Sequence, residues 1–214
     1  MVEALTKLHK VKPKNKKFKF YERQISGLVS ISDAQAKVEA NGDKVGELPR
    51  LKEMIEWFKR NAVKDEVSII HGDYKLDNVI IHPVESKVIG ILDWELSTIG
   101  HPLSDLANLL LPYYIPSSFS GFGMKSENFT AVGIPEVEEL LQHYCSLMER
   151  PFPIPNWDFC LSVILQGIAA RVKRKQASSE QALQYAKMFK PLAKLGLEIV
   201  DRGDLVEQVI KSKI

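Results

Sequence analysis

The chain has 214 residues, of which 45% are hydrophobic and 26% are charged, enough to bury a core in one domain or one and a half. Its 29 basic and 27 acidic side chains leave a net charge of only +2, so no strong field draws it to nucleic acid or to a membrane. No apolar run approaches the roughly 20 residues that a membrane-spanning helix needs. Cys145 and Cys160 lack metal-ligand spacing, so we expect reduced core thiols in a reducing compartment.

Helical spacing of apolar residues predicts three helices in the first part of the chain. They are expected over residues 1–11, 22–40 and 48–62. Pro13 and the lysines around it predict a basic linker after the first helix, and Asn41-Gly42-Asp43 should end the second. The third is the most amphipathic, since its apolar residues recur on one face: Leu51, Met54, Ile55 and Phe58.

The middle of the chain predicts short apolar strands on both sides of a polar loop. Strands are expected over 67–70, 79–82 and 87–92, with a turn at 83–86. After Asp93 we expect helices, separated by an irregular stretch over 112–133. These helices span 102–111, 135–149, 157–175 and the region from 178 onward. The order predicts an α+β, mostly α domain in which a small β patch carries the polar loop.

The polar loop and the strand after it carry the residue types that phosphoryl transfer to a hydroxyl requires. Asp73 is the candidate general base, which would orient the attacking hydroxyl and accept its proton. Asn78, five residues later, and Asp93, at the end of the next hairpin, offer hard oxygen ligands of the kind that Mg²⁺ prefers. Taken singly, Asp73 and Asn78 also fit turn residues, and Asp93 fits a helix N-cap. The hairpin that should bring Asn78 and Asp93 together favours a site.

Four nearby residues have candidate supporting roles. Lys75 could offset charge on the transferring phosphoryl group, although a simply exposed lysine fits the sequence nearly as well. His71 is expected to tie the loop to the core by hydrogen bonds. Asp105 is expected to accept backbone N–H groups and steady the loop from behind. Glu95 fits about equally well a further metal ligand, a residue that supports a ligand, and a solvated carboxylate.

The combined pattern resembles the aminoglycoside and choline-kinase-like phosphotransferases. It consists of His71-Gly72-Asp73, Asn78 and Ile91-Leu92-Asp93-Trp94-Glu95. The resemblance is closest to the kinase-like domain that precedes an acyl-CoA dehydrogenase in some proteins. The segments that carry this closer resemblance are Tyr21–Gln24, His71–His82, Leu92–Thr98, Pro102–Ala107, Asn156-Trp157 and Leu165–Gly167.

The resemblance implies a protein-kinase-like fold that uses ATP and Mg²⁺. Asp73 and Lys75 would be catalytic, and Asn78 and Asp93 would bind the metal and the nucleotide. The acceptor would be a small-molecule hydroxyl, with a hydroxyacyl or hydroxyacyl-CoA compound among the candidates. Gly72 stands where many protein kinases have Arg, so control by a phosphorylated activation loop is not expected. By this resemblance the chain divides into a linker helix and basic linker at the end of the hinge region (1–20), a C-lobe (21–203) and a tail (204–214).

Two features depart from the family. No strand–glycine loop–strand that would grip the ATP phosphates precedes the polar loop, and Gly42 and Gly46 lie in a polar turn. Residues 159–164 run directly into Leu165-Gln166-Gly167, where relatives have an extra aromatic-rich piece, so a helix should be about two turns shorter. The sequence therefore predicts a C-lobe without its N-lobe, with an N-lobe or a partner protein in trans as a possible complement.

Three functions remain open on the sequence. The first is an ATP- and Mg²⁺-dependent kinase domain, here truncated, and the second is a catalytically inactive kinase-like binding module, so enzyme status is undecided. The third, a metal-dependent phosphohydrolase using His71, Asp73, Asp93 and His101, has the wrong histidine spacing and leaves Asn78 without a role. His82 and His101 are otherwise expected to be ordinary loop residues.

The chain ends give weak indications of location. The lysine-rich N-terminus has neither the apolar stretch of a signal peptide nor the arginine and serine content of a transit peptide, so we expect a cytoplasmic protein. Ser212-Lys213-Ile214 resembles the peroxisomal Ser-Lys-Leu signal and leaves that compartment as an alternative. Neither a nucleic acid nor a membrane is expected as a partner.

Overall fold

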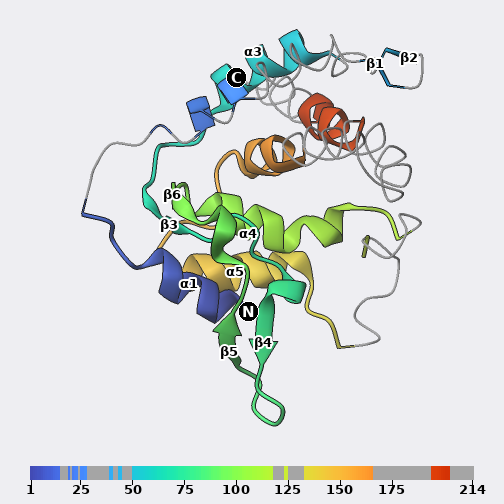
Figure 1. Cartoon of the computed structure of the whole chain (residues 1–214). Helices are drawn as coiled ribbons and strands as arrows, with labels where there is room; N and C mark the ends of the chain where they lie inside the picture. Colours follow the sequence, from blue (N-terminus) through green and yellow to red (C-terminus); the bar gives the residue numbers. More distant parts are fainter. Residues whose placement is uncertain are drawn as a thin grey trace. The chain divides into compact units, whose positions relative to one another are not determined.

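The computed structural model describes most of the chain and divides it into two compact units. The described residues are 1–14, 19, 21–23, 25–27, 39–40, 43–44, 50–117, 123–124, 133–165 and 194–202. The first unit contains residues 1–20 and 64–157, and the second contains 21–63 and 158–214. Small antiparallel sheets accompany a mostly helical chain (Figure 1), so the predicted α+β, mostly α class is confirmed. In the described part, no helix has the length and apolarity that crossing a membrane requires.

Three helices lie in the described part of the first unit, and a helix was predicted at each of the three places. They are α1 (Val2–His9), α4 (Leu103–Leu110) and α5 (Val137–Leu147). A short 3₁₀ helix, η3 (Leu111–Tyr114), continues α4. α1 packs against α5 and against the strand that leads into the polar loop. Their fully buried side chains include Leu5, Leu106 and Tyr144, so the loop is attached to a packed helical core.

Two separate two-stranded sheets flank the polar loop, where a single patch was expected. β4 (Val79–Ile81) pairs with β5 (Val88–Ile91) in the predicted hairpin, which extends away from the helices in Figure 1. β3 (Ser68–Ile70), however, pairs antiparallel with β6 (Thr98–Gly100). The sequence predicted only a loop and helices after Asp93, so β6 was missed. A 3₁₀ turn, η2 (Trp94–Leu96), is followed by β6 before α4 begins.

The pairing of β3 with β6 joins the start and the end of the chain segment that contains the polar loop. The chain enters the loop from β3, leaves it through another 3₁₀ turn, η1 (Leu76–Asn78), and continues into β4. It returns along β5 to Asp93 and then pairs through β6 with β3. Because the start and the end of this excursion are hydrogen-bonded, the loop and the Asp93 turn are held at fixed positions relative to each other.

In the second unit, an aromatic cluster packs one face of α3 (Leu51–Asn61), the predicted amphipathic helix. Trp57, Phe58 and Tyr21 contact Phe159, whose ring is fully buried. Phe159 lies in a helical segment over 157–165, and residues 194–202 are helical as well. The cluster explains why Trp57 is buried although the predicted face did not include it.

The predicted helix over 22–40 is wrong at its end. Residues 21–23 and 25–27 are helical, but β1 (Glu39–Ala40) pairs antiparallel with β2 (Asp43–Lys44). Asn41-Gly42, which stands between these strands in the sequence, is a frequent two-residue hairpin signal and outweighs the weak helical spacing. Several predictions lie outside the described residues. They concern residues 166–175, the helix from 178 to 193 and the Ser212-Lys213-Ile214 signal.

Both cysteines are free and buried, as predicted. Cys145 lies in α5, where burial raises the pKa of its thiol. Cys160 accepts a hydrogen bond from the Tyr21 hydroxyl at 3.3 Å. The two thiols are therefore part of the interior packing of their units.

His101 is a buried structural residue, and the prediction of an ordinary loop histidine was wrong. Its Nε2 lies 3.0 Å from the Lys64 carbonyl oxygen, and its Nδ1 accepts the Leu103 N–H at 3.2 Å. The ring is fully buried just before α4. Nδ1 can accept a hydrogen bond only while it carries no proton, so both the burial and this bond favour the neutral ring.

We predict that His101 makes the first unit less stable at mildly acidic pH. Burial lowers the pKa of His101 below 6.5, so below that pH the unfolded chain takes up a proton that the folded ring does not. The free energy of unfolding should then fall, by at most about 1.4 kcal/mol per pH unit, as the pH drops from about 6.5 toward the folded pKa. Urea denaturation at about pH 7.5 and about pH 5.5 measures the loss.

His101→Gln is the matched variant, because an amide keeps a donor for Lys64 but does not titrate. It should be less stable than the native chain at the higher pH and should lose less free energy of unfolding between the two pH values. An equal loss in both proteins would contradict the prediction.

Candidate active site

Asp73 lies in the polar loop with both carboxylate oxygens engaged. Its Oδ2 is 2.8 Å from the Lys75 ammonium and accepts the Asn78 amide N–H at 3.1 Å. Its Oδ1 faces the amide of Asn108 on α4 at 3.4 Å. The side chain is 31% exposed, so it is held by three neighbours and still reachable from solvent. A general base that must meet a substrate hydroxyl requires this combination.

Asn78 is buried, and its amide has one orientation. Its Nδ2 donates to the backbone carbonyl of Asp73 at 2.9 Å as well as to the Asp73 carboxylate. Its own N–H bonds to the Lys75 carbonyl at 3.1 Å, which closes the η1 turn. With the nitrogen committed to Asp73, the amide oxygen of Asn78 is the atom left to serve as a ligand.

Asp93 follows β5 in an unusual backbone conformation. The hairpin ladder continues one step beyond β5, because the Leu92 N–H donates to the Asn78 carbonyl at 2.9 Å, and Asp93 is therefore adjacent to the Asn78 strand end. Asp93 has φ 57° and ψ 57°, the left-handed region that few non-glycine residues adopt and that is frequent at functional sites. η2 begins after it, yet its carboxylate makes no capping hydrogen bond. The exposed carboxylate is thus not used as an N-cap.

Asp105 holds the entrance of the loop from the core side. Its Oδ2 accepts the His71 N–H at 2.6 Å, and its Oδ1 accepts the Gly72 N–H at 2.8 Å. The side chain lies in the first turn of α4 and is 1% exposed. A buried carboxylate with two backbone donors is a rigid attachment, and this is the contact that the supporting role requires.

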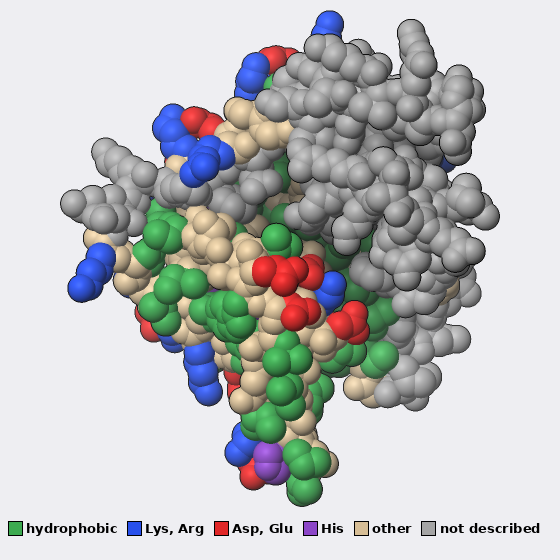
Figure 2. Space-filling view, in the orientation of Figure 1, with side chains coloured by type: hydrophobic (Ala, Val, Ile, Leu, Met, Phe, Trp, Pro, Cys, Tyr) green, Lys and Arg blue, Asp and Glu red, His purple; other side chains and the backbone are tan. Residues whose placement is uncertain are grey.

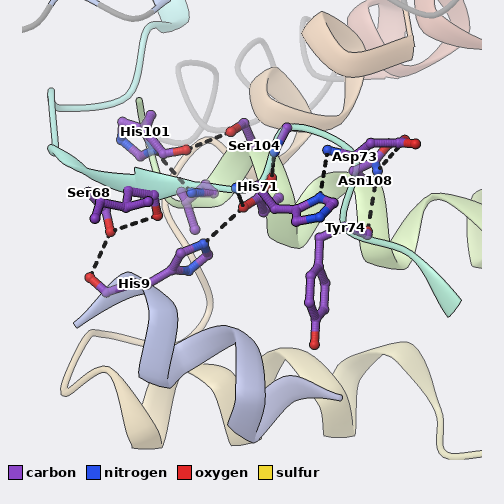
Figure 3. A network of polar contacts seen from close by, with 12 residues as sticks. His9, Ser68, His71, Asp73, Tyr74, His101, Ser104 and Asn108 are labelled. Carbon is purple, nitrogen blue, oxygen red and sulfur yellow. Dashed lines mark hydrogen bonds and ion pairs between the residues drawn. The ribbon is translucent and has the colours of Figure 1, made fainter. Parts of the chain in front are cut away.

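His71 connects the loop that carries Asp73 to the strand end that precedes Asp93. Its Nδ1 accepts the Asp73 N–H at 3.3 Å, and its Nε2 lies 2.6 Å from the Leu92 carbonyl oxygen. Since a carbonyl only accepts, Nε2 carries the hydrogen. The Trp94 ring packs edge-on against the imidazole, 5.0 Å away between centroids. One buried ring therefore ties Asp73 to the residue that precedes Asp93. Figure 3 shows its bond to Asp73.

Gly72 is required by both conformation and space. Its φ is +85°, and a Cβ atom there would lie within 2.4 Å of the Leu96 carbonyl oxygen. The loop thus passes directly over the end of η2. Any side chain at this position would separate the loop from the turn that begins at Asp93.

Several residues of the site were missed on the sequence. Asn108 donates to the Tyr74 carbonyl at 3.2 Å and faces Asp73. It lies three residues after Asp105 on α4, so helical spacing could have identified it. His9, whose ring contacts Asp105 at 3.4 Å, comes from a distant helix and gave no local signal.

The donor set suits a hard cation. Asn78 and Asp93 offer an amide oxygen and a carboxylate, which are typical Mg²⁺ ligands, and Mg²⁺ commonly completes its shell with water and phosphate oxygens. Among the described residues, no group of three His, Cys, Asp or Glu side chains is placed to hold a metal. His71 and His101 use both ring nitrogens within the protein. This removes the phosphohydrolase hypothesis, which needed them as ligands.

The surface around the site is divided between acidic and apolar side chains. Asp77, Asp93 and Glu95 are exposed, and Figure 2 shows acidic side chains gathered above the apolar side chains of the β4–β5 hairpin. Glu95 lies in η2, two residues after Asp93. A cavity of 910 Å³ opens beside the loop between α1, β5 and η3, with Lys75 and Trp94 in its wall. Its lining includes Lys75 but none of Asp73, Asn78 and Asp93.

Comparison with known proteins places this geometry in a family. The model of the phosphotransferase enzyme family matches residues 1–152. Acyl-CoA dehydrogenase family member 11 from Homo sapiens is 36% identical over 219 residues, covering 94% of this chain and 27% of its own length. Family member 10 from Mus musculus is 38% identical over 164 residues, covering 72% of this chain and 15% of its own length. The chain thus spans about a quarter or less of these curated relatives.

Solved structures agree with the family model. A Ralstonia eutropha protein assigned as an aminoglycoside phosphotransferase superposes with a TM-score of 0.79 at 27% identity, over 94% of this chain and 63% of that chain. An aminoglycoside-3'-phosphotransferase of type VIII gives a TM-score of 0.52 at 16% identity, over 78% of this chain and 58% of that one, and at that identity it shows the fold alone. The predicted resemblance and the protein-kinase-like C-lobe fold are confirmed.

We predict that Gly72→Ala destabilises the chain more than Gly133→Ala does. Both glycines have positive φ, but a Cβ at Gly133 meets nothing within 4 Å, so Gly133→Ala isolates the backbone strain, about 1 kcal/mol. Gly72→Ala adds the overlap with Leu96, for about 2–4 kcal/mol in all. Urea denaturation of both variants measures the difference. Equal losses would show that the loop does not pass over η2 as described.

Proposed function

Because the chain belongs to the phosphotransferase enzyme family, we propose that it is the kinase-like domain of an ATP- and Mg²⁺-dependent enzyme that phosphorylates a small-molecule hydroxyl. The observation that carries the proposal is the Asp73 carboxylate, held by Lys75 and Asn78 and still open to solvent. The exposed Asp93 carboxylate, which makes no capping hydrogen bond, follows the strand end that is bonded to Asn78. This combination of one base and two oxygen ligands is what phosphoryl transfer to a hydroxyl requires.

In the proposed reaction, Asp73 orients the acceptor hydroxyl and accepts its proton as the bond to phosphorus forms. Its Oδ2 already has two partners at 2.8 and 3.1 Å, whereas Oδ1 has only the Asn108 amide at 3.4 Å. Oδ1 is therefore the atom with room for the hydroxyl. Lys75 is the cation closest to this carboxylate among the described contacts, and its ammonium can offset the charge that develops on the transferring group.

Asn78 and Asp93 would hold Mg²⁺ in this proposal. When bound, the ion neutralises charge on the nucleotide phosphates and aligns them for transfer. The protein contributes stiff ligands, since Asn78 is fixed by its bonds to Asp73 and Asp93 by the αL turn after β5. Glu95, exposed in η2, is the candidate for a further acidic group near the ion.

For the acceptor, we propose a hydroxyacyl compound or hydroxyacyl-CoA. The curated relatives are named as acyl-CoA dehydrogenases, and an acyl chain with a hydroxyl is the substrate type that a kinase domain joined to such an enzyme could supply or consume. A reducing compartment, with the cytoplasm first, is part of the proposal because both cysteines are free and buried.

A binding module is the second candidate, and one observation favours it. Eight exposed large hydrophobic side chains lie between residues 76 and 96, which is an unusual concentration for one short segment. They are Leu76, Ile80, Ile81, Val84, Ile89, Leu92, Trp94 and Leu96. Such a face could dock an N-lobe or a partner protein in trans. Two results together would favour the enzyme instead. The native protein would stay monomeric, and it would bind Mg·ATP with an affinity that Asp93→Ala loses.

The first functional prediction concerns nucleotide binding. Mg·ATP at about 100 times its Kd should stabilise the chain by about 2.7 kcal/mol, a shift of several degrees in Tm. Asp93→Ala should lose this shift, because it removes one of the two proposed ligands. Asp77→Ala is the control, since it removes an exposed carboxylate of the same loop that has no proposed role. If neither the native chain nor the control shifts while both are folded, the proposed nucleotide site is wrong.

The second functional prediction concerns the base. Asp73→Asn keeps the size and the contact with Lys75 but cannot accept a proton, so phosphoryl transfer from ATP to a 3-hydroxyacyl-CoA should fall by about 10²–10⁴-fold. Radiolabelled product formation measures this, with Asp77→Asn as the matched control. Transfer that is unchanged in Asp73→Asn would overturn the assignment of the base.

A further inference from the structure

A chain of buried polar groups runs from α5 to the loop that carries Asp73. The Tyr144 hydroxyl lies 2.9 Å from His9 Nδ1, and His9 Nε2 lies 3.4 Å from Asp105 Oδ2. Asp105 in turn accepts the N–H groups of His71 and Gly72. The side chains of Tyr144, His9 and Asp105 are each at most 1% exposed. The chain connects α5, α1, α4 and the loop without a step through solvent. Figure 3 shows His9 of α1 beneath the loop that carries His71 and Asp73.

The Asp105 carboxylate and the Tyr144 hydroxyl, at the two ends of this chain of polar groups, set the direction of each hydrogen bond. An ionised carboxylate only accepts, so His9 must donate to Asp105 from Nε2. His9 Nδ1 is then free to accept the Tyr144 O–H. Burial raises the pKa of Tyr144 above its ordinary value of 10, so its hydroxyl keeps the hydrogen at neutral pH. Every hydrogen in the chain therefore points toward Asp105.

Asp105 Oδ2 needs this third donor. A buried carboxylate is costly unless its oxygens are hydrogen-bonded, and in this contact set Oδ1 has the Gly72 N–H while Oδ2 is shared between His71 and His9. Without His9, the carboxylate could rotate away from the loop to regain a partner. The imidazole itself is well placed, because Ser68 Oγ donates to the His9 carbonyl at 2.8 Å and ties the end of α1 to β3.

We propose that His9, with Tyr144 behind it, is a positioning residue that sets the geometry of the catalytic loop through Asp105. It touches neither the candidate base nor the ligands. Its effect passes from Asp105 to the backbone of His71 and Gly72, and from the His71 ring to the Asp73 N–H and the Leu92 carbonyl. That the loop is catalytic rests on the proposed function. That His9 positions the loop through Asp105 does not.

The test is amide hydrogen exchange of the full chain, read by NMR at His71, Gly72 and Asp73. His9→Ala removes the donor to Asp105 and should speed exchange of these three amides by about tenfold, the factor for losing one hydrogen bond to a charged group. His9→Gln, whose amide can donate from nearly the same place as Nε2, should restore most of the protection. Tyr144→Phe keeps the ring and loses only the hydroxyl, so a smaller increase is expected.

Leu5→Val is the matched control. Leu5 is fully buried one turn before His9 on α1, so its substitution loosens packing there without touching the polar chain. Exchange rates are compared after correction for the free energy of unfolding measured in urea. The proposal is overturned if the exchange rates of the loop amides rise equally in His9→Ala and Leu5→Val. It is also overturned if these amides exchange as fast in His9→Gln as in His9→Ala. If His9→Ala does not fold, Tyr144→Phe against Leu5→Val decides in the same way.

A kinetic readout separates this proposal from the proposed function. With Mg·ATP and a 3-hydroxyacyl-CoA, His9→Ala should lower kcat by about tenfold while KM for ATP changes less than about twofold, because the loop and not the nucleotide ligands is disturbed. If the native chain transfers no phosphoryl group, that result would count against the proposed function alone. The exchange experiment would still decide whether His9 positions the loop.

Discussion

The buried carboxylate of Asp105 is the contact on which the rest of the site depends. It accepts two successive backbone N–H groups at 2.6 and 2.8 Å, and these belong to the residues immediately before Asp73. A carboxylate removed from water is stable only with such donors, so the loop and α4 stabilise each other. The position of the candidate base is thereby a property of the helical core and not of the loop itself.

Strained or crowded backbone brings the second half of the site to the first. Gly72 passes so close to Leu96 that no side chain fits, and Asp93 adopts a left-handed conformation that turns its carboxylate out of the hairpin. The His71 ring bonds to both sides of this crossing. Three residues, a glycine, an αL aspartate and a buried histidine, thus hold together two loops that are about 20 positions apart in the sequence.

Much of the site was predictable because its signals are local. Asp73 and Asn78 lie in one short loop, the apolar spacing of β4 and β5 predicts their hairpin, and a hairpin necessarily places Asp93 near Asn78. The helices α1, α3 and α5 were found for the same reason, since 3.6-residue periodicity is visible without a partner. The pairing of β3 with β6 was not found, because three residues carry no periodicity and only the partner strand defines them.

By itself, the sequence determined the chemistry of the loop, the helical pattern and the likeness to the phosphotransferase family. These rest on residue types and spacings that act within a few positions. The tertiary structure decided which distant groups support the loop. Asn108, His9 and Tyr144 reach it from three helices, and His101 is a buried capping neighbour of α4. No spacing rule links residues 135 positions apart, as His9 and Tyr144 are, because only packing of α1 against α5 brings their side chains together.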